Sequence, residues 1–355
     1  MNRETLLPLL SGFGVAIGAG LASALLFLVL TKGTIIALCL AYFAPLPLMI
    51  ASLGFGQWTG LVGALLGSGL VAALAYPSVG AALYPIAIAV PAWLICAAAL
   101  RGVPPAEQQS RRTAQQAQPA APNGAPMRAL TAGTLFLAAA FSIGALILAG
   151  TYGGLSAALG RLTSELAPLI RELKASLTSL PESVDPDRLA WLLARTIAPT
   201  MAASALSVVI ANLWLAARTV QISARLPTVW PDIPYNLRLP VPLAAALIPA
   251  IGLIFVGREI GFVALIVAAV LGTALSLQGL AVMHDLTRGM SARTPLLFGA
   301  YLVMSFIPPW PMAVFALVGL VEAALGLRER KRLRQAAPPP SPRSKSEKTD
   351  ASDPA

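Results

Sequence analysis

The sequence contains few charged residues. Only 11% of its 355 residues are Asp, Glu, Lys or Arg, whereas 57% are hydrophobic. The mean hydropathy is +0.76. A soluble globular chain has about 25% charged residues. Half of that charge leaves too little polar surface to cover a water-soluble particle of this size. We therefore predict that lipid covers part of the protein surface.

Histidine and cysteine are also scarce. The single histidine, His284, stands beside Asp285, and Cys39 and Cys96 lie within apolar stretches without a CxxC motif. A metal site or a disulfide is not expected from this pattern, and the two cysteines are predicted to be small buried hydrophobes. No phosphate loop, HExxH motif or GxSxG motif with a partner histidine is present. We therefore predict no cofactor and no enzymatic activity, with an intramembrane enzyme as the third alternative for function.

Long apolar runs are what the sequence has instead. A crossing of the hydrocarbon core needs about 20 residues. We predict an all-α membrane bundle of about ten transmembrane helices, of which the last two share the apolar block Pro295–Leu327. The other eight spans are Leu6–Leu30, Thr34–Ser52, Gly60–Tyr76, Ala81–Leu100, Ala129–Gly150, Thr196–Ala217, Val241–Gly257 and Gly261–Met283. Prolines at 308, 309 and 311 divide the last block, and one kinked helix there is the alternative, which would give nine spans.

Changes in composition divide the chain into four regions. Residues 1–100 form a four-span N-terminal membrane region, and 128–330 form a six-span C-terminal membrane region. Between them, 101–127 is rich in Gln, Pro, Ala and Arg without apolar periodicity, which predicts a flexible cytoplasmic linker. Residues 331–355 are predicted to be a disordered basic cytoplasmic tail.

The formal net charge of +10 has a topological pattern. Most Lys and Arg residues lie in segments that ten spans would place on the same side as the N-terminus. Because short cytoplasmic loops are enriched in Lys and Arg, this bias predicts a bacterial inner-membrane protein with both termini in the cytoplasm. The same placement favours the lipid bilayer, and not nucleic acid, as the partner of the basic residues.

One segment, 155–180, is amphipathic and not uniformly apolar. Leucines recur in it at three- and four-residue steps, with charged residues between them. This spacing predicts an amphipathic helix on the outer face, which Pro168 should kink or split because its ring opposes the carbonyl of Ser164. The helix would lie on the membrane surface or pack over the bundle, or alternatively act as a lid or a partner-docking element.

Three polar residues fall within predicted spans and are candidates for lining a ligand cavity. These are Asn212, Gln278 and Glu322. Each polar group at membrane depth must find a partner inside the bundle, so structural bonding between helices is the alternative. Glu322 requires a basic partner, a hydrogen-bonded network or protonation. Arg328 lies six residues further along, which is not the same face of a regular helix.

Proline and small residues suggest further features of the bundle. Pro45 and Pro47 interrupt the second predicted span, and Pro85 and Pro91 interrupt the fourth. Such breaks expose backbone groups at membrane depth, as transporter substrate sites do. The first span carries small residues four apart on two adjacent faces, which permits close helix packing within the protein or docking of another subunit. One face holds Gly14, Gly18 and Ala22, and the other holds Ala16, Gly20 and Ala24.

Several stretches resemble the YybS-like family of bacterial inner-membrane proteins. They are YFAPLPLMIASLGFGQWTGLVGALLGSG (42–69), RLPTVWPDIPYNLRLP (225–240), LQGLAVMH (277–284) and GLVEAALGLRERKR (319–332). The resemblance covers most of residues 5–332. That family is regarded as distantly related to the S components of energy-coupling-factor transporters. The resemblance implies an unknown small-molecule ligand and an energising ATPase with its transmembrane module as partner. It also nominates Ala16, Gly20 and Ala24 as the helix face that contacts this module.

We therefore predict small-molecule binding or transport of the S-component type. The alternative is a non-catalytic membrane scaffold that assists assembly or envelope processes through protein contacts. The first function requires a ligand-sized cavity, which we expect to be lined by Asn212, Gln278 or Glu322, whereas a scaffold can have these groups bonded to other helices.

Overall fold

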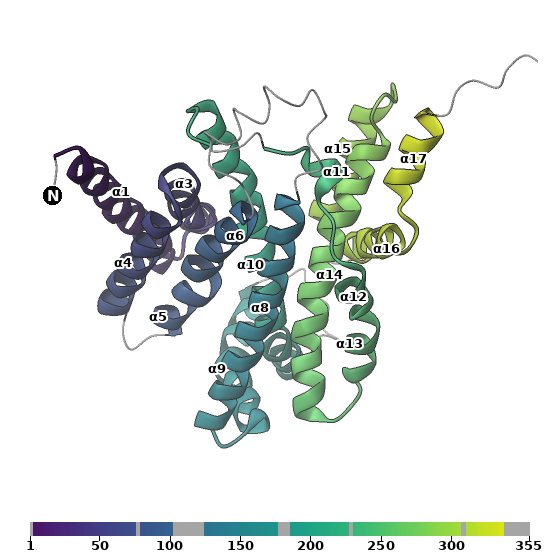
Figure 1. The fold of residues 1–355 in the computed structure, drawn as a ribbon. Coiled ribbons are helices and arrows are strands. Elements are labelled where there is room, and N and C mark those ends of the chain that lie inside the picture. The colour runs from purple at the N-terminus through teal and green to yellow at the C-terminus, as the bar shows by residue number, and fades with distance from the viewer. Residues whose placement is uncertain are drawn as a thin grey trace, which may run out of the picture.

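The described part of the chain is helical throughout, which agrees with the predicted all-α class (Figure 1). The computed structural model describes residues 3–75, 79–101, 124–176, 185–226, 230–306 and 310–336. The longest helices are α1 (Arg3–Leu28), α4 (Gln57–Ala75), α8 (Ala125–Thr151), α9 (Leu155–Ser176), α10 (Pro186–Ile222) and α14 (Arg258–Leu286). The intermediate ones are α3 (Pro45–Phe55), α6 (Val90–Leu100), α15 (Arg293–Phe306), α16 (Trp310–Leu325) and α17 (Leu327–Ala336). Short helices are η1 (Val29–Lys32), α2 (Ile35–Ala41), α5 (Val79–Tyr84), the π-helical η2 (Pro85–Ala89), α11 (Ile233–Asn236), α12 (Val241–Ala245) and α13 (Leu247–Leu253).

The prediction of ten membrane spans is only partly confirmed. In the residues described, seven helical segments are long and apolar enough to cross a membrane, and the bent pair α16–α17 makes eight if it forms one span. The predicted span Val241–Gly257 is too short, because its helical part ends at Leu253 and is divided into α12 and α13. The block Pro295–Leu327 forms two helices, α15 and α16, but α15, with 14 residues, is not among the helices long enough to cross a membrane. Residues 307–309 between them are outside the described ranges.

Proline explains where two spans are divided. A helical residue donates its backbone N–H to the carbonyl four residues earlier, and proline has no N–H to donate. Helix α2 ends at Ala41, four residues before Pro45, and α12 ends at Ala245, four residues before Pro249. In the fourth span the predicted interruption is milder. Pro85 begins a single π-helical turn, and residues 81–100 remain one apolar segment long enough to cross.

The boundaries of the predicted linker and tail shift in the structure. Helix α8 begins at Ala125 and takes up the last three residues of the predicted linker 101–127. Helix α17 continues to Ala336, so residues 331–336 are helical although they were predicted to be disordered. The remaining parts of these predictions, 102–123 and 337–355, lie outside the described residues.

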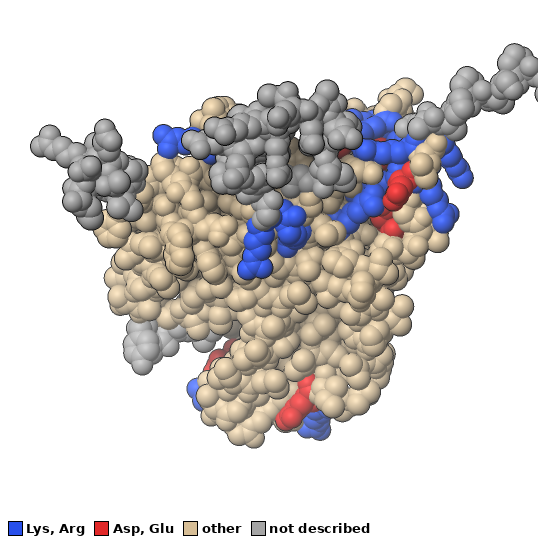
Figure 2. Space-filling view, in the orientation of Figure 1, with Lys and Arg blue, Asp and Glu red and all other residues tan. Residues whose placement is uncertain are grey.

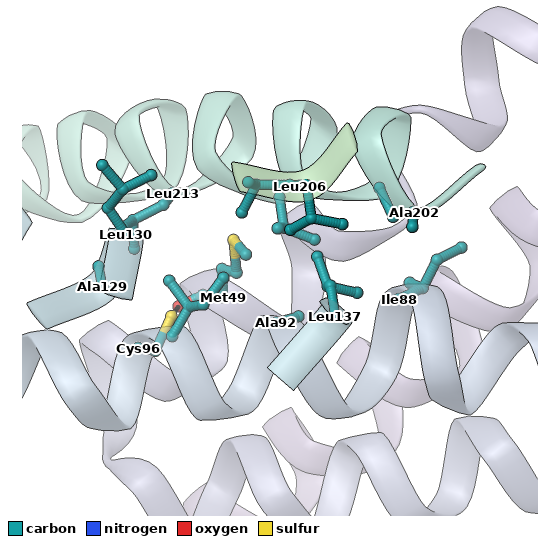
Figure 3. Packing of buried hydrophobic residues seen from close by; sticks show 14 of the residues in the cluster. Met49, Ile88, Ala92, Cys96, Ala129, Leu130, Leu137, Ala202, Leu206 and Leu213 are labelled. Carbon is teal, nitrogen blue, oxygen red and sulfur yellow. Dashed lines mark hydrogen bonds between the residues drawn. The ribbon is translucent and has the colours of Figure 1, made fainter. Parts of the chain in front are cut away.

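The two predicted membrane regions share one apolar core. Helix α3 packs against α10, and α6 packs against α8. Figure 3 shows Met49 of α3 and Cys96 of α6 beside Leu130 of α8 and Leu206 of α10. All four side chains are almost fully buried. Residues before and after the linker segment therefore belong to one bundle.

Charged residues are concentrated at the two ends of the bundle (Figure 2). Lys and Arg gather at the top of this view, a broad uncharged band follows, and fewer charged residues lie at the bottom. We call the top the basic end, which holds the C-termini of α10 and α14, Arg288 and helix α17. The bottom is called the opposite end, which holds the α8–α9 turn and the start of α14. The uncharged band has the character of a surface covered by lipid.

The predicted amphipathic helix is present as α9. It runs from Leu155 to Ser176 and packs mainly against α10, with an ion pair between Arg171 and Asp187 at 2.5 Å. Pro168 lies inside this one continuous helix, so the predicted split is wrong, and a kink there stays a prediction. Leu169 and Leu173 remain more than half exposed, at 62% and 54%.

The small-residue face nominated on α1 is buried inside the protein. Ala16 and Ala24 are 1% and 0% exposed, and Gly20 is buried. A Cβ added at Gly20 would lie 2.6 Å from the carbonyl oxygen of Gly63 on α4. Helix α4 therefore occupies this face, and a partner that contacts α1 must use another one.

This close packing predicts a strong contrast between two glycines of α1. Gly20→Ala forces α1 away from the α4 backbone, so we expect a loss of about 1–3 kcal/mol of stability from overpacking. Gly18→Ala is the matched control, because nothing lies within 4 Å of a Cβ added at this exposed position. Thermal unfolding in mild detergent measures both variants. Equal stability of the two would contradict the α1–α4 contact.

Candidate functional site

Asn212 of α10 forms a hydrogen bond with the backbone at the break between α2 and α3. Its Nδ2 donates to the carbonyl oxygens of Tyr42 and Val208, both at 2.8 Å. The Tyr42 carbonyl lacks its usual helical partner, because the backbone N–H of Leu46 donates to the carbonyl of Phe43 instead. Asn212 is 5% exposed, and its Oδ1 has no protein partner. The break thus faces protein, with one amide oxygen left unbonded.

Gln278 of α14 is bonded at both ends of its amide. Its Oε1 accepts from the backbone N–H of Leu239 at 2.5 Å, and its Nε2 donates to the carbonyl of Gly319 at 2.8 Å. Gly279 and Gly319 let α14 and α16 approach closely. A Cβ at Gly279 would lie 2.0 Å from the carbonyl oxygen of Phe315.

Glu322 has the basic partner that its burial requires, and this partner is Arg328. The Nε of Arg328 donates to Oε1 of Glu322 at 2.8 Å, and the side chains are 0% and 2% exposed. The sequence-based statement that Arg328 lies on a different face is wrong. Gly326 adopts a φ of +60°, and α16 and α17 meet at 61°, which turns Arg328 back toward Glu322.

Arg328 extends this pair into a network. Its two terminal nitrogens donate to the carbonyls of Pro234 at 2.6 Å and Leu237 at 3.1 Å. We use the name Arg328 network for Gln278, Glu322 and Arg328 with the backbone of residues 234–239. Two of the three predicted cavity residues therefore lie in one network, while Asn212 lies apart from it on α10. Every polar end of Gln278 and Glu322 is bonded to protein, which fixes residues 234–239 against α14 and α16.

The surface of the basic end adds further ionic contacts. Arg288 makes a bidentate ion pair with Asp232, at 2.5 and 2.6 Å. The hydrogen bond to Asp232 raises the pKa of Arg288 above its usual value, so this guanidinium stays charged. The Nζ of Lys331 donates to the carbonyls of Asp285 and Leu286 at the end of α14. These bonds tie α17 and the segment before α11 to the bundle.

No metal centre is formed by the residues that the structure describes: they contain no group of three His, Cys, Asp or Glu side chains with suitable spacing. His284 lies 2.8 Å from the hydroxyl of Tyr301. Both cysteines are free; Cys96 is buried as predicted, whereas the same prediction is wrong for Cys39, which is exposed.

An open surface pocket is present at the opposite end of the bundle, away from the predicted residues. Its volume is about 510 Å³, and two loops far apart in the sequence line it. One is the α8–α9 turn, Gly153–Ser156, and the other is Gly257–Ile260 at the start of α14. Ligand pockets typically have volumes of about 300–1,000 Å³.

Polar groups from both loops meet in this cavity. The guanidinium of Arg258 donates to Oγ of Ser156 at 2.7 Å, and Glu259 also lines the wall. Gly153, Gly154 and Gly257 have positive φ values of 79°, 122° and 63°. These conformations favour glycine, and the N–H groups of Gly153 and Gly154 donate to the carbonyls of Gly150 and Ala149 at the end of α8.

An apolar trough of about 380 Å³ adjoins the cavity and shares Glu259 and Ile260 with it. Its other lining residues come from α8, α13 and α14, and they are Leu146, Ala250, Leu253, Val263, Ala264 and Val267. We call the two together the opposite-end cavity and its trough. Sequence reasoning missed this site, although Gly153–Gly154 before α9 and Gly257 before Arg258 are visible turn signals.

Comparisons with known proteins leave the resemblance as a prediction. No protein-family model, no curated protein and no solved structure matches the chain.

The Arg328 network predicts that Glu322 is a structural residue. Glu322→Gln removes the negative charge beside a buried guanidinium, and we expect about 3 kcal/mol of destabilisation. Glu329→Gln is the matched control, because Glu329 is exposed and its ion pair with Arg238 is 3.8 Å long. This change should cost less than about 1 kcal/mol. Thermal unfolding in detergent compares the two, and wild-type stability of Glu322→Gln would show that the pair is dispensable.

Proposed function

We propose that this chain is a non-enzymatic membrane protein that binds a small molecule in the opposite-end cavity. The observation that carries the proposal is the cavity itself, which is ligand-sized and combines Arg258, Glu259 and Ser156 with an adjoining apolar trough. A few polar groups beside a larger apolar surface are typical of small-molecule sites.

The proposed binding site differs from the one expected from the sequence. Gln278 and Glu322 are bonded to protein groups and line neither the cavity nor the trough. Asn212 keeps one free oxygen, but it does not line them either. We therefore assign a structural role to the Arg328 network and a binding role to the start of α14.

We further propose that the basic end faces the cytoplasm of a bacterial inner membrane. The concentration of Lys and Arg there supports this orientation, because short cytoplasmic segments are enriched in these residues. The cavity then opens to the outside, where an uptake protein meets its ligand. Uptake of the S-component type would require a separate energising ATPase and its transmembrane module.

A scaffold is the second candidate function, and a specific observation favours it. Apolar side chains of α9 and the first part of α10 are exposed near the opposite end, including Leu173, Trp191 and Leu192. Exposed patches of this kind often contact other proteins or lipid. Helix α10, at 37 residues, is ~55 Å long and exceeds the hydrocarbon thickness of ~30 Å.

The proposed orientation predicts the labelling pattern of two introduced cysteines. In a Cys39→Ser background, we expect Ser156→Cys to react with a membrane-impermeant maleimide added to intact spheroplasts. Met290→Cys, an exposed position at the basic end, should react only after permeabilisation. The buried Cys96 should stay unlabelled. Labelling of both positions from the same side would disprove the orientation.

Uptake of the S-component type predicts that the energising module copurifies with the tagged chain. We expect affinity purification from native membranes in mild detergent to recover an ATPase and a transmembrane subunit in stoichiometric amounts. An unrelated polytopic protein with the same tag is the control. Absence of both subunits, in a preparation that retains other membrane complexes, would reject the S-component type of uptake. Stoichiometric recovery of envelope-assembly proteins in their place would favour the scaffold.

A further inference from the structure

The charge pattern of the opposite-end cavity restricts the class of ligand. Arg258 contributes one positive charge and Glu259 one negative charge, and both lie in the first turn of α14. A purely anionic ligand is repelled by Glu259, and a purely cationic one is repelled by Arg258. A ligand that carries both charges can satisfy both residues.

The trough adds a requirement for an apolar chain. Glu259 is the charged residue among its lining side chains. Leu146, Leu253 and Ile260 are 46%, 45% and 55% exposed, so the trough is open along its side. In a bilayer these side chains face acyl chains, and a lipid can enter without leaving the membrane.

We propose that the opposite-end cavity holds a zwitterionic phospholipid with a phosphate and a primary ammonium in its head. This inference rests on the proposed function and names its ligand. Arg258 and Ser156 bind the phosphate, since a guanidinium forms charge-assisted hydrogen bonds with phosphate oxygens. Glu259 accepts from the ammonium, and one acyl chain lies in the trough.

A primary ammonium fits better than a quaternary one. Its N–H groups donate charge-assisted hydrogen bonds to a carboxylate, whereas a quaternary ammonium has none to donate. Because Glu259 lines both the cavity and the trough, its carboxylate is close to a head group whose tail lies in the trough. The expected order of affinity is therefore phosphatidylethanolamine, then phosphatidylcholine, then phosphatidylglycerol.

The test measures binding of these three lipids to the full-length protein by native mass spectrometry from detergent. We expect wild type to prefer phosphatidylethanolamine over phosphatidylglycerol by about fivefold, which corresponds to about 1 kcal/mol. Glu259→Gln should abolish this preference. Arg258→Gln should weaken the binding of all three lipids by a similar factor. Soluble phosphoethanolamine, which lacks the acyl chain, should not displace bound lipid.

Two controls separate the ligand class from the site. Arg188→Gln and Glu172→Gln change exposed charges on α10 and α9 outside the cavity, and they should leave the preference unchanged. Val263→Phe fills the trough and should weaken the binding of every lipid. Thermal unfolding checks that this variant is folded.

The possible failures are distinguishable. An unchanged preference in Glu259→Gln, or equal binding of the three lipids to wild type, would overturn the zwitterionic assignment while the cavity remains a binding site. Displacement by phosphoethanolamine would overturn the phospholipid in favour of a soluble ligand with the same head. If neither Arg258→Gln nor Val263→Phe weakens any lipid, the proposed function of the cavity fails with it.

Discussion

The hydrogen bonding of backbone groups away from water is the constraint on which this structure depends. In lipid an unbonded carbonyl or N–H costs several kcal/mol, so a helix can break at membrane depth only where protein groups replace the lost bonds. Asn212 holds the carbonyl of Tyr42 at the α2–α3 break, and Ser23 donates to the neighbouring carbonyl of Ala44 at 2.6 Å. At the basic end, Arg328 does the same for the irregular segment before α12, through the carbonyls of Pro234 and Leu237. Asn212, Ser23 and Arg328 thus bond the backbone at breaks in the chain, and Asn212 keeps one unbonded oxygen.

This use of polar groups explains where binding chemistry remains possible. Each polar atom of Gln278 and Glu322 is bonded to protein, to Leu239, Gly319 or Arg328, and the side chains line neither the cavity nor the trough. Helix ends are other places where polar groups can serve a ligand, because the first-turn N–H groups have no partner within the helix. The α8–α9 turn and the start of α14 are two such places, and they lie side by side at the opposite end. A site at that end needs no polar residue within the hydrocarbon layer.

Local features could be predicted from the sequence, and features that depend on distant packing could not. The all-α class, the apolar spans, the amphipathic helix after Leu155 and the division of the span at Pro45 all follow from composition, periodicity and proline chemistry. The Glu322–Arg328 pair did not follow, because six residues bring two side chains together only after the bend at Gly326. The partner of the Gly20 face was equally hidden, since small residues permit close contact without saying which helix provides it. The cavity is formed by loops about 100 residues apart in the chain, which no local pattern connects.

The proposed binding residues and the structural residue Gln278 lie far apart on α14, so their effects can be separated by substitution. Arg258 and Glu259 begin the helix, and Gln278 lies 20 residues after Arg258, which corresponds to ~30 Å along a regular helix. Changes this far apart with no shared contacts usually have additive effects. Next to Gln278, α14 is held to α16 by two close backbone contacts, Gly279 against Phe315 and Leu275 against Gly319. We therefore expect substitutions in the proposed binding site to leave the Arg328 network intact, whereas substitutions of Glu322 remove an ion pair within that network. A loss of binding can then be traced to the cavity itself, because the network that stabilises the fold remains intact.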